Sequence, residues 1–148
     1  MLSCVTKIRV RYADTDQMKF VYYAKYLEYF EQGRSDLLRQ IGLPYPEIEK
    51  MGYLLPVIEA FVKYRQPARY DELLEVRTML QEIPAARIRI GYEVFRAGDS
   101  TTIAEGHTVH SIVSADTGKA VRAPLLFVEA IAVAFKKSAK GHQTLQEA

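Results

Sequence analysis

The chain has 148 residues, a length that suits one domain around one hydrophobic core. Hydrophobic residues make up 49% and charged residues 26%, a composition that excludes a disordered or fibrous chain. The net charge of +2 is too small to indicate nucleic-acid binding. The single cysteine excludes an intrachain disulfide framework. The sequence shows neither a signal-peptide pattern nor an apolar run that could form a transmembrane segment, so we expect a cytoplasmic protein.

The first predicted element is a half-buried strand at residues 7–12, where apolar residues alternate with basic ones. Its apolar face consists of Ile8, Val10 and Tyr12. A polar stretch at 13–19 interrupts the alternation. From Tyr22 the apolar residues follow a helical period, until Gly42 and Pro44 end the predicted helix. The apolar stripe of this helix consists of Tyr23, Tyr26, Leu27, Phe30, Gly33, Leu37, Leu38 and Ile41.

The second half of the chain has a β pattern. Strands are predicted at residues 54–64, 73–82, 87–96 and 101–114, with a further short one near Val121. The segments between them are short, which suits antiparallel hairpins and not crossovers. Residues 124–135 predict a final short helix, and 136–148 form a polar tail that we expect to be frayed.

This order of elements predicts an α+β fold, with a long central helix wrapped by an antiparallel sheet of about five or six strands. We expect a single domain at residues 1–135, followed by the polar C-terminal tail at 136–148. The edges of such a sheet need cover, so pairing between two subunits is expected.

Two carboxylates, Asp14 and Asp16, lie between the predicted strand and helix. The first backbone N–H groups of a helix lack intrahelical partners and form a positive end that suits a developing oxyanion. Asp16 and the helix start near Tyr23 are close enough in sequence for a carboxylate and an oxyanion site to face one substrate carbonyl. The alternative is that both aspartates only shape a turn or cap the helix, and the spacing alone favours that alternative.

The run YADTDQM at residues 12–18, continued by FVYYAKYLEYFE at 20–31, resembles the signature of the 4-hydroxybenzoyl-CoA thioesterase-like family. It is most similar to the acyl-CoA thioesterase branch that includes YbgC and FadM. Later segments at 65–73 and 105–122 agree with the same family, and in the same order. The resemblance implies the hotdog fold, an acyl-CoA substrate, no metal or redox cofactor, and a homodimer or homotetramer.

The resemblance also places the catalytic carboxylate on Asp16, and the backbone N–H that polarises the thioester carbonyl on Tyr23. Many members carry histidine at the latter position, so this chain keeps the backbone donor and lacks that imidazole. Lys19 stands where the family often has glycine. Asp16 would act either as a nucleophile or as a general base, and the sequence leaves both open. Asp14 is expected to be structural.

The remaining polar candidates are weighed on geometry. His107 and His110 lie three apart in a predicted strand, so their side chains point to opposite faces and no shared metal site is expected. Arg34 falls within the apolar stripe of the helix, which predicts a carboxylate partner or a polar cavity within hydrogen-bonding reach. Glu31 and Glu59 are the candidate partners in a structural ion pair.

Three residues are candidates for binding the substrate. Glu59 interrupts an apolar strand and is the second choice for a carboxylate lining the pocket. Arg65 and Arg122 are candidates for contacts with the phosphates of CoA, although a single arginine on a strand is more often only solvated.

The sequence therefore predicts a thioesterase that hydrolyses an acyl-CoA to the free acid and CoA, with CoA as part of the substrate and no retained cofactor. One alternative is a thioesterase that acts on acyl carrier protein. Another is a non-catalytic acyl-CoA-binding module on the same fold, because a fold does not determine function.

Overall fold

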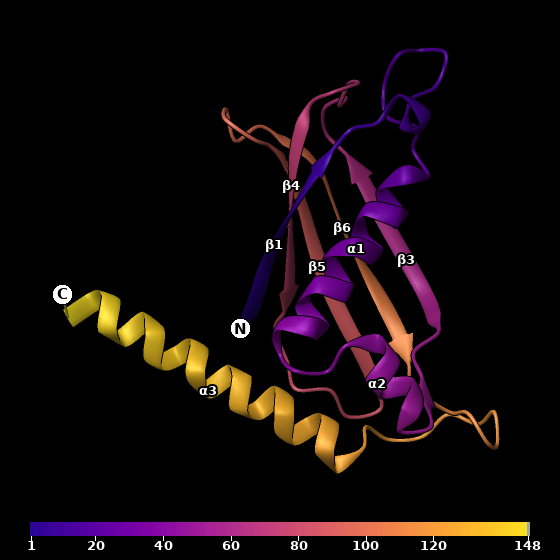
Figure 1. The fold of residues 1–148 in the computed structure, drawn as a ribbon, viewed down its shortest axis with the longest axis vertical. Helices are drawn as coiled ribbons and strands as arrows, with labels where there is room; N and C mark the ends of the chain where they lie inside the picture. The colour runs from indigo at the N-terminus through magenta and orange to yellow at the C-terminus, as the bar shows by residue number, and fades with distance from the viewer. Residues whose placement is uncertain (148) are drawn as a thin grey trace.

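The computed structural model describes the backbone of residues 1–147 and the side chains of residues 1–140. The elements in chain order are β1 (Leu2–Arg9), the 3-10 helix η1 (Tyr12–Asp14), α1 (Lys25–Gln40), α2 (Tyr45–Lys50), β2 (Tyr53–Leu54), β3 (Val57–Tyr64), β4 (Leu73–Leu80), β5 (Arg87–Arg96), β6 (Thr102–Ser111), β7 (Val113–Ser114) and α3 (Leu125–Glu147). Five strands form an antiparallel sheet in the order β1-β4-β5-β6-β3, and β2 pairs with β7 (Figure 1).

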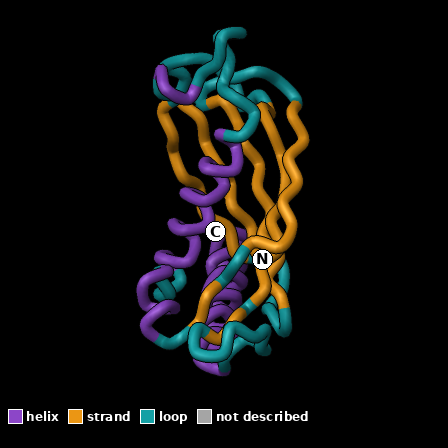
Figure 2. The backbone as a smooth tube through the Cα atoms, turned by 90° about the vertical axis from the view of Figure 1, so that its right-hand side faces the viewer, coloured by secondary structure: helices purple, strands orange, loops and turns teal. Residues whose placement is uncertain are grey.

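Helix α1 packs on one face of the five-stranded sheet (Figure 1, Figure 2). The buried residues of α1 are Tyr26, Tyr29, Phe30, Gly33, Leu37 and Leu38. The strands present alternate residues to the helix, because successive side chains of a strand point to opposite faces. In β5 these buried residues are Ile88, Ile90, Tyr92 and Val94. The predicted α+β arrangement, a long helix against an antiparallel sheet, is therefore confirmed.

The helix and the sheet approach each other closely at Gly33. A Cβ atom at this position would lie 2.2 Å from Oγ1 of Thr78 and 3.2 Å from Cγ1 of Val76. Thr78 is fully buried in β4, and its hydroxyl has no hydrogen-bond partner within the described residues. Phe30, one turn earlier in α1, stacks on Tyr92 with the ring centroids 4.2 Å apart. The missing side chain at position 33 thus sets how near α1 can lie to β4.

The first strand lies earlier in the chain than the predicted strand at 7–12, which was wrong at both ends. Val10 is buried as expected, whereas Tyr12 lies in η1 and is 79% exposed. The carboxylate of Asp14 accepts a hydrogen bond from the backbone N–H of Arg11 at 3.0 Å. This contact turns the chain before the β alternation can continue.

The predicted strand at 54–64 is divided in two. The chain pairs first as β2 and then, after Pro56, as β3, because proline has no N–H group for a strand ladder. The predicted short strand near Val121 is reduced to an isolated bridge between Val113 and Ala120.

Helix α1 begins at Lys25, later than the predicted start at Tyr22. Tyr23 therefore precedes the helix and is 62% exposed, and Leu27 in its first turn is 41% exposed. The N-terminal part of the predicted apolar stripe is therefore only partly buried, since Tyr26 is buried against Tyr64 at the end of β3 whereas Tyr23 and Leu27 are exposed.

Helix α3 is longer than predicted. It runs to Glu147, so the tail that was expected to be frayed is helical as far as it is described. Phe127 and Ile131 are buried and hold the first turns of α3 on the domain, and no proline interrupts the residues that follow. The later part of α3 projects away from the sheet (Figure 1). The division into a domain at 1–135 and a tail at 136–148 stays a prediction.

Gly33→Ala is expected to lower the free energy of unfolding by about 1–3 kcal/mol, because the added Cβ overpacks the contact between α1 and β4. The loss should shrink in a Thr78→Ala background, where the atom that the new Cβ meets is absent. Chemical unfolding of the single and double variants measures both effects. Gly91→Ala is the matched control, since a Cβ there would lie 3.6 Å from its nearest neighbour. An equal loss in both backgrounds would contradict the close-approach explanation.

Candidate active site

Asp16 lies in a tight turn between η1 and α1. Its backbone N–H donates to the Phe20 carbonyl at 2.9 Å, and its carbonyl accepts the N–H of Lys19 at 3.0 Å. Oδ1 of Asp16 accepts the N–H of Met18 at 2.8 Å, a common role of aspartate in turns. Lys19 has a φ of 67°, in the left-handed region that favours glycine. Asp16 is half-buried, and within the described residues only Oδ1 of its carboxylate accepts a hydrogen bond.

Asp14 ties this turn to α1. Its side chain is buried, and Oδ2 accepts hydrogen bonds from the Arg11 N–H at 3.0 Å and the Tyr29 hydroxyl at 2.9 Å. Its backbone carbonyl accepts the N–H of Tyr22 at 2.8 Å, and the ammonium of Lys25 lies 3.9 Å from Oδ1. Burial and the bond to Asp14 raise the pKa of Tyr29, so the hydroxyl stays a donor. These contacts agree with the structural role expected for Asp14.

Tyr23 lies between this turn and the first turn of α1. The Tyr22 carbonyl accepts the N–H of Lys25 at 2.9 Å, and the Tyr23 carbonyl accepts the hydroxyl of Tyr64 at 2.9 Å. No acceptor among the described residues lies within hydrogen-bonding reach of the Tyr23 N–H. The side-chain hydrogen bond with Tyr23 raises the pKa of Tyr22, and the charge of Asp16 contributes in the same direction. A carboxylate and an unoccupied backbone donor therefore lie in one short segment.

A second loop, between β3 and β4, packs against the Asp16 turn. The N–H of Val21 donates to the Ala68 carbonyl at 2.8 Å. The guanidinium of Arg69 lies over the ring of Phe20, 5.2 Å from its centroid, in a cation–π contact. The segment that closes the Asp16 turn is thus supported by the loop between β3 and β4.

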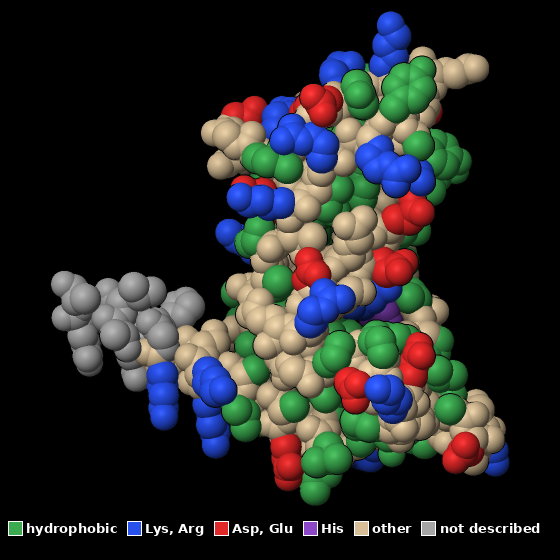
Figure 3. Space-filling view, viewed as in Figure 1, with side chains coloured by type: hydrophobic (Ala, Val, Ile, Leu, Met, Phe, Trp, Pro, Cys, Tyr) green, Lys and Arg blue, Asp and Glu red, His purple; other side chains and the backbone are tan. Residues whose placement is uncertain are grey.

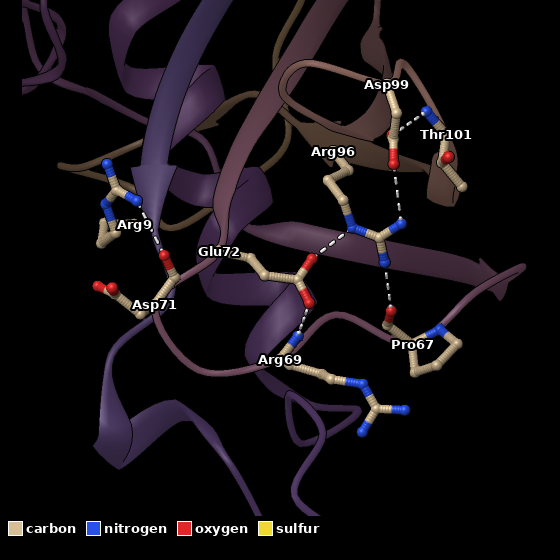
Figure 4. Close-up of polar contacts among 8 residues, drawn as sticks. All are labelled: Arg9, Pro67, Arg69, Asp71, Glu72, Arg96, Asp99 and Thr101. Carbon is tan, nitrogen blue, oxygen red and sulfur yellow. Dashed lines mark hydrogen bonds and ion pairs between the residues drawn. The ribbon is translucent and has the colours of Figure 1, made fainter.

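Arg96 holds this second loop in shape (Figure 4). Its guanidinium forms an ion pair with Glu72, donates to the Pro67 carbonyl at 3.0 Å and lies 3.4 Å from Oδ2 of Asp99. Glu72 in turn accepts the backbone N–H of Arg69 at 3.0 Å. One arginine at the end of β5 therefore joins the two ends of the loop on which the Asp16 turn rests.

Arg65, one of the predicted substrate-binding residues, lies at the same end of the sheet as the Asp16 turn. It follows Tyr64 directly, and Tyr64 contacts the segment before α1. Its guanidinium is paired with Glu105, with Nη2 and Oε1 2.6 Å apart. Because Glu105 lines the open groove on the sheet face away from α1, the Arg65 guanidinium points toward that face, although its backbone lies at the Asp16 end of the sheet.

Arg122 lies at the opposite end of the sheet. The backbone N–H of the next residue, Ala123, donates to the Ala85 carbonyl at 2.7 Å, in the loop before β5. The strand register puts the start of β5 beside the end of β6 and far from the end of β3. Within one chain the structure does not bring Arg122 together with Asp16.

Glu59 is exposed on the edge strand β3, about 16 Å along the strand from Tyr64. It pairs with His107, with Oε1 and Nε2 3.0 Å apart, and this hydrogen bond lowers the pKa of Glu59. Both residues line an open groove with Arg89 on the sheet face away from α1. Glu59 therefore does not lie beside the Asp16 turn of its own chain.

The prediction that the two strand histidines point to opposite faces is confirmed, because His107 lines the open groove and His110 is buried in the core. Within the described residues no group of His, Cys, Asp and Glu is arranged to hold a metal ion. No helix in the described part of the chain is both long and apolar enough to cross a membrane.

Arg34 reaches a chain of hydroxyl groups inside the core. Its Nη1 donates to the Tyr92 hydroxyl at 3.2 Å, and that hydroxyl lies 2.7 Å from Oγ1 of Thr108. Oγ1 of Thr108 lies 2.9 Å from Nε2 of His110. The expected polar surroundings of Arg34 are therefore present. Among the described residues no ion pair joins Arg34 to either candidate, Glu31 or Glu59, and Glu59 is paired with His107 on the other face of the sheet.

Basic and apolar side chains gather at the end of the molecule that carries the Asp16 turn (Figure 3). The exposed basic residues there are Arg9, Arg11, Lys19, Arg65 and Arg69. The exposed apolar and aromatic residues are Tyr12, Met18, Tyr22 and Tyr23. Such a mixed surface suits a ligand with both anionic and apolar parts.

A family model described as the thioesterase-like superfamily matches residues 10–135. The chain belongs to this superfamily. One relative, the acyl-CoA thioesterase YbgC of Haemophilus influenzae, is 30% identical over 129 residues, which cover 86% of this chain and 90% of that protein.

Two solved structures are similar to the chain over most of its length. The chain is similar to a DHNA-CoA thioesterase from Staphylococcus aureus with a TM-score of 0.85 and 28% identity, over 95% of this chain and 96% of the other. A hypothetical protein, TT1821 from Thermus thermophilus, gives a TM-score of 0.81 and 40% identity over 87% of this chain and 97% of that one. The predicted hotdog fold, the family and the enzyme class, a thioester hydrolase, are confirmed.

Sequence reasoning missed three residues around the site: Tyr64, Glu72 and Arg96. Tyr64 ends a predicted strand, and its bond to Tyr23 joins residues 41 positions apart. Glu72 and Arg96 flank two different strands and meet only because β4 pairs with β5. All three lie at the ends of predicted strands, where loops carry functional residues, and Glu72 also lies in the family-like segment 65–73.

His110 predicts a pH dependence of stability. Burial lowers the pKa of its imidazole from 6.5, so the folded state favours the neutral form. Its contribution to the free energy of unfolding should be complete above pH 6.5 and decrease as the pH falls from there toward the lowered folded pKa. Chemical unfolding between about pH 7.5 and 5 measures this decrease, which His110→Gln should reduce. If the free energy of unfolding decreased equally with falling pH in the wild type and in His110→Gln, a group other than His110 would be responsible.

Proposed function

We propose that this protein hydrolyses an acyl-CoA to a free acid and CoA. One observation carries the proposal: Asp16 is held in the turn that precedes α1, and the backbone N–H of Tyr23, in the segment between that turn and the helix, has no acceptor among the described residues. The substrate class is supported by the relative YbgC, which is named an acyl-CoA thioesterase. The reaction needs water and a carboxylate, and no retained cofactor.

In this proposal Asp16 acts by one of two routes. As a nucleophile, its carboxylate adds to the thioester carbonyl, CoA leaves as the thiol, and water hydrolyses the resulting anhydride. As a general base, it takes a proton from a water molecule that attacks the carbonyl directly. Both routes need the negative charge of Asp16. Oδ2 is the oxygen that suits either route, because Oδ1 accepts the N–H of Met18.

Both routes also place negative charge on the former carbonyl oxygen, and we assign its stabilisation to the Tyr23 N–H. A backbone donor that is already oriented stabilises an oxyanion without reorganisation. The positive end of α1 favours the same charge. Because the donor belongs to the backbone, tyrosine in place of the histidine common in the family keeps this function.

Arg65, Glu59 and Arg122 are proposed to bind the substrate. Arg65 and its basic neighbours at the Asp16 end suit the phosphates of CoA. Glu59 and Arg122 lie away from the Asp16 turn of their own chain. Their roles therefore require a second subunit that brings them to the site.

A homodimer or homotetramer supplies that second subunit. The edge strand β3 exposes Val57, Ile58, Phe61 and Tyr64, each between 48% and 49%. An exposed apolar edge strand is suited to pairing with another copy of the chain. The cytoplasm stays the expected location from the sequence.

Asp16→Asn tests the catalytic role. The change keeps the size and the turn hydrogen bond but removes the charge, so kcat should fall at least about 100-fold while KM changes little. Release of the CoA thiol from a panel of acyl-CoAs measures both constants, and a parallel panel of acyl carrier proteins tests the alternative substrate.

Asp116→Asn is the matched control, because Asp116 is exposed in the turn after β7 and should tolerate the change. Wild-type turnover in Asp16→Asn would refute the assignment. Unfolding of Asp16→Asn, with the control intact, would favour a structural role for this carboxylate.

Ile58→Lys tests the assembly. A charge on the exposed apolar edge of β3 should shift the protein toward the monomer in sedimentation velocity and lower turnover with it. Val5→Lys is the control, since Val5 is 52% exposed on the other edge strand, β1, beside which α3 lies. A wild-type protein that sediments as a monomer at assay concentration would contradict a site shared between subunits.

A further inference from the structure

Tyr64 joins the edge of the sheet to the segment before α1. Its hydroxyl donates to the Tyr23 carbonyl at 2.9 Å. Its ring packs edge-on against Tyr26, with the centroids 5.4 Å apart. Tyr26 is buried in the first turn of α1, so the position of the Tyr64 ring is set by the core. The hydroxyl of Tyr64 is therefore a fixed point against which the backbone at Tyr23 is held.

Two peptide planes meet at the Cα of Tyr23: the Tyr22–Tyr23 plane carries the Tyr23 N–H, and the Tyr23–Ala24 plane carries the Ala24 N–H. The first plane is held at the Tyr22 carbonyl, which accepts the N–H of Lys25 at 2.9 Å. The second plane is held only at the Tyr23 carbonyl, and the donor there is the hydroxyl of Tyr64. Without the Tyr64 bond the carbonyl of the second plane has no hydrogen-bond donor among the described residues, because it precedes the first hydrogen-bonded turn of α1.

We propose that Tyr64 is a positioning residue for thioester hydrolysis, which fixes the Tyr23–Ala24 peptide and thereby aims the backbone N–H of Ala24 at the oxyanion, beside that of Tyr23. The inference deepens the proposed function and rests on it. Tyr64 itself touches no reacting atom in this scheme and acts through the backbone.

Two further observations agree with this role. Burial raises the pKa of Tyr64, so its hydroxyl stays protonated and able to donate at neutral pH. A hydrogen bond to a peptide carbonyl polarises the N–H of the same peptide, which here belongs to Ala24. The Ala24 N–H also has no acceptor among the described residues, and Ala24 has helical dihedral angles. Tyr64 thus strengthens a second donor beside the Tyr23 N–H.

Tyr64→Phe removes the hydroxyl and leaves the ring. We expect kcat to fall about tenfold, less than the loss of an oxyanion donor itself, with KM within about twofold of wild type. The matched control is Tyr45→Phe. The Tyr45 hydroxyl accepts the backbone N–H of Leu55 at 3.2 Å, at the far end of α1 from Asp16. Tyr45→Phe therefore also loses one hydroxyl–backbone bond and should leave kcat unchanged.

A second measurement does not depend on the reaction. In the free protein, Tyr64→Phe should shift the amide resonances of Tyr23 and Ala24 in NMR spectra and increase their backbone mobility, whereas Tyr45→Phe should leave them unchanged. Unchanged amide resonances and mobility in Tyr64→Phe would overturn the proposal, whatever the activity. A rise in KM with unchanged kcat would also overturn it, because substrate binding and not the transition state would then be affected.

The two proposals fail in different ways. If the wild-type protein released no thiol from any acyl-CoA, the proposed function would fall and with it the catalytic meaning of Tyr64. If the wild type is active and Asp16→Asn is inactive, but Tyr64→Phe keeps full kcat, only the positioning role is overturned.

Discussion

The candidate site depends on one buried carboxylate, that of Asp14. It accepts the Tyr29 hydroxyl and the Arg11 N–H, while its backbone carbonyl accepts the N–H of Tyr22. A buried carboxylate is stable only when its hydrogen bonds are made, so the partners of Asp14 must stay in place. Two of those partners flank the Asp16 turn in sequence, and Tyr29 belongs to α1. The position of Asp16 relative to the helix start follows from this requirement.

Parts of the chain far apart in sequence complete the site. The turn with Asp16 rests on the loop between β3 and β4, whose shape Arg96 maintains through Glu72 and Pro67. The end of β3 contributes the Tyr64 hydroxyl to the same region. The sheet thus acts as a rigid frame that holds the proposed catalytic carboxylate and backbone donor, both carried by loops, an arrangement common in enzymes because loops alone are too mobile.

Within a single chain, two of the residues predicted to bind the substrate, Glu59 and Arg122, lie away from Asp16. Glu59 is paired with His107 on the open face of the sheet, and Arg122 lies near the loop before β5. Neither is near Asp16 in the same subunit, and Arg65 shares only the end of the sheet with it. The exposed apolar residues of β3 favour an assembly in which two copies share these residues, since an edge strand of this kind is otherwise prone to unspecific pairing.

Sequence alone determined the types of the main elements and the family, because helical period, β alternation and the run around Asp16 are local patterns. It placed Phe30 and Leu37 in the core correctly, but it extended α1 back to Tyr22, since the apolar period does not show where the sheet ends. Only the tertiary structure decided which residues meet: Arg34 with the hydroxyl of Tyr92, 58 positions away, and Tyr64 with Tyr23. Such pairs follow from the order and register of the strands. Both are decided when the whole sheet packs on one helix, so no local stretch of sequence shows them.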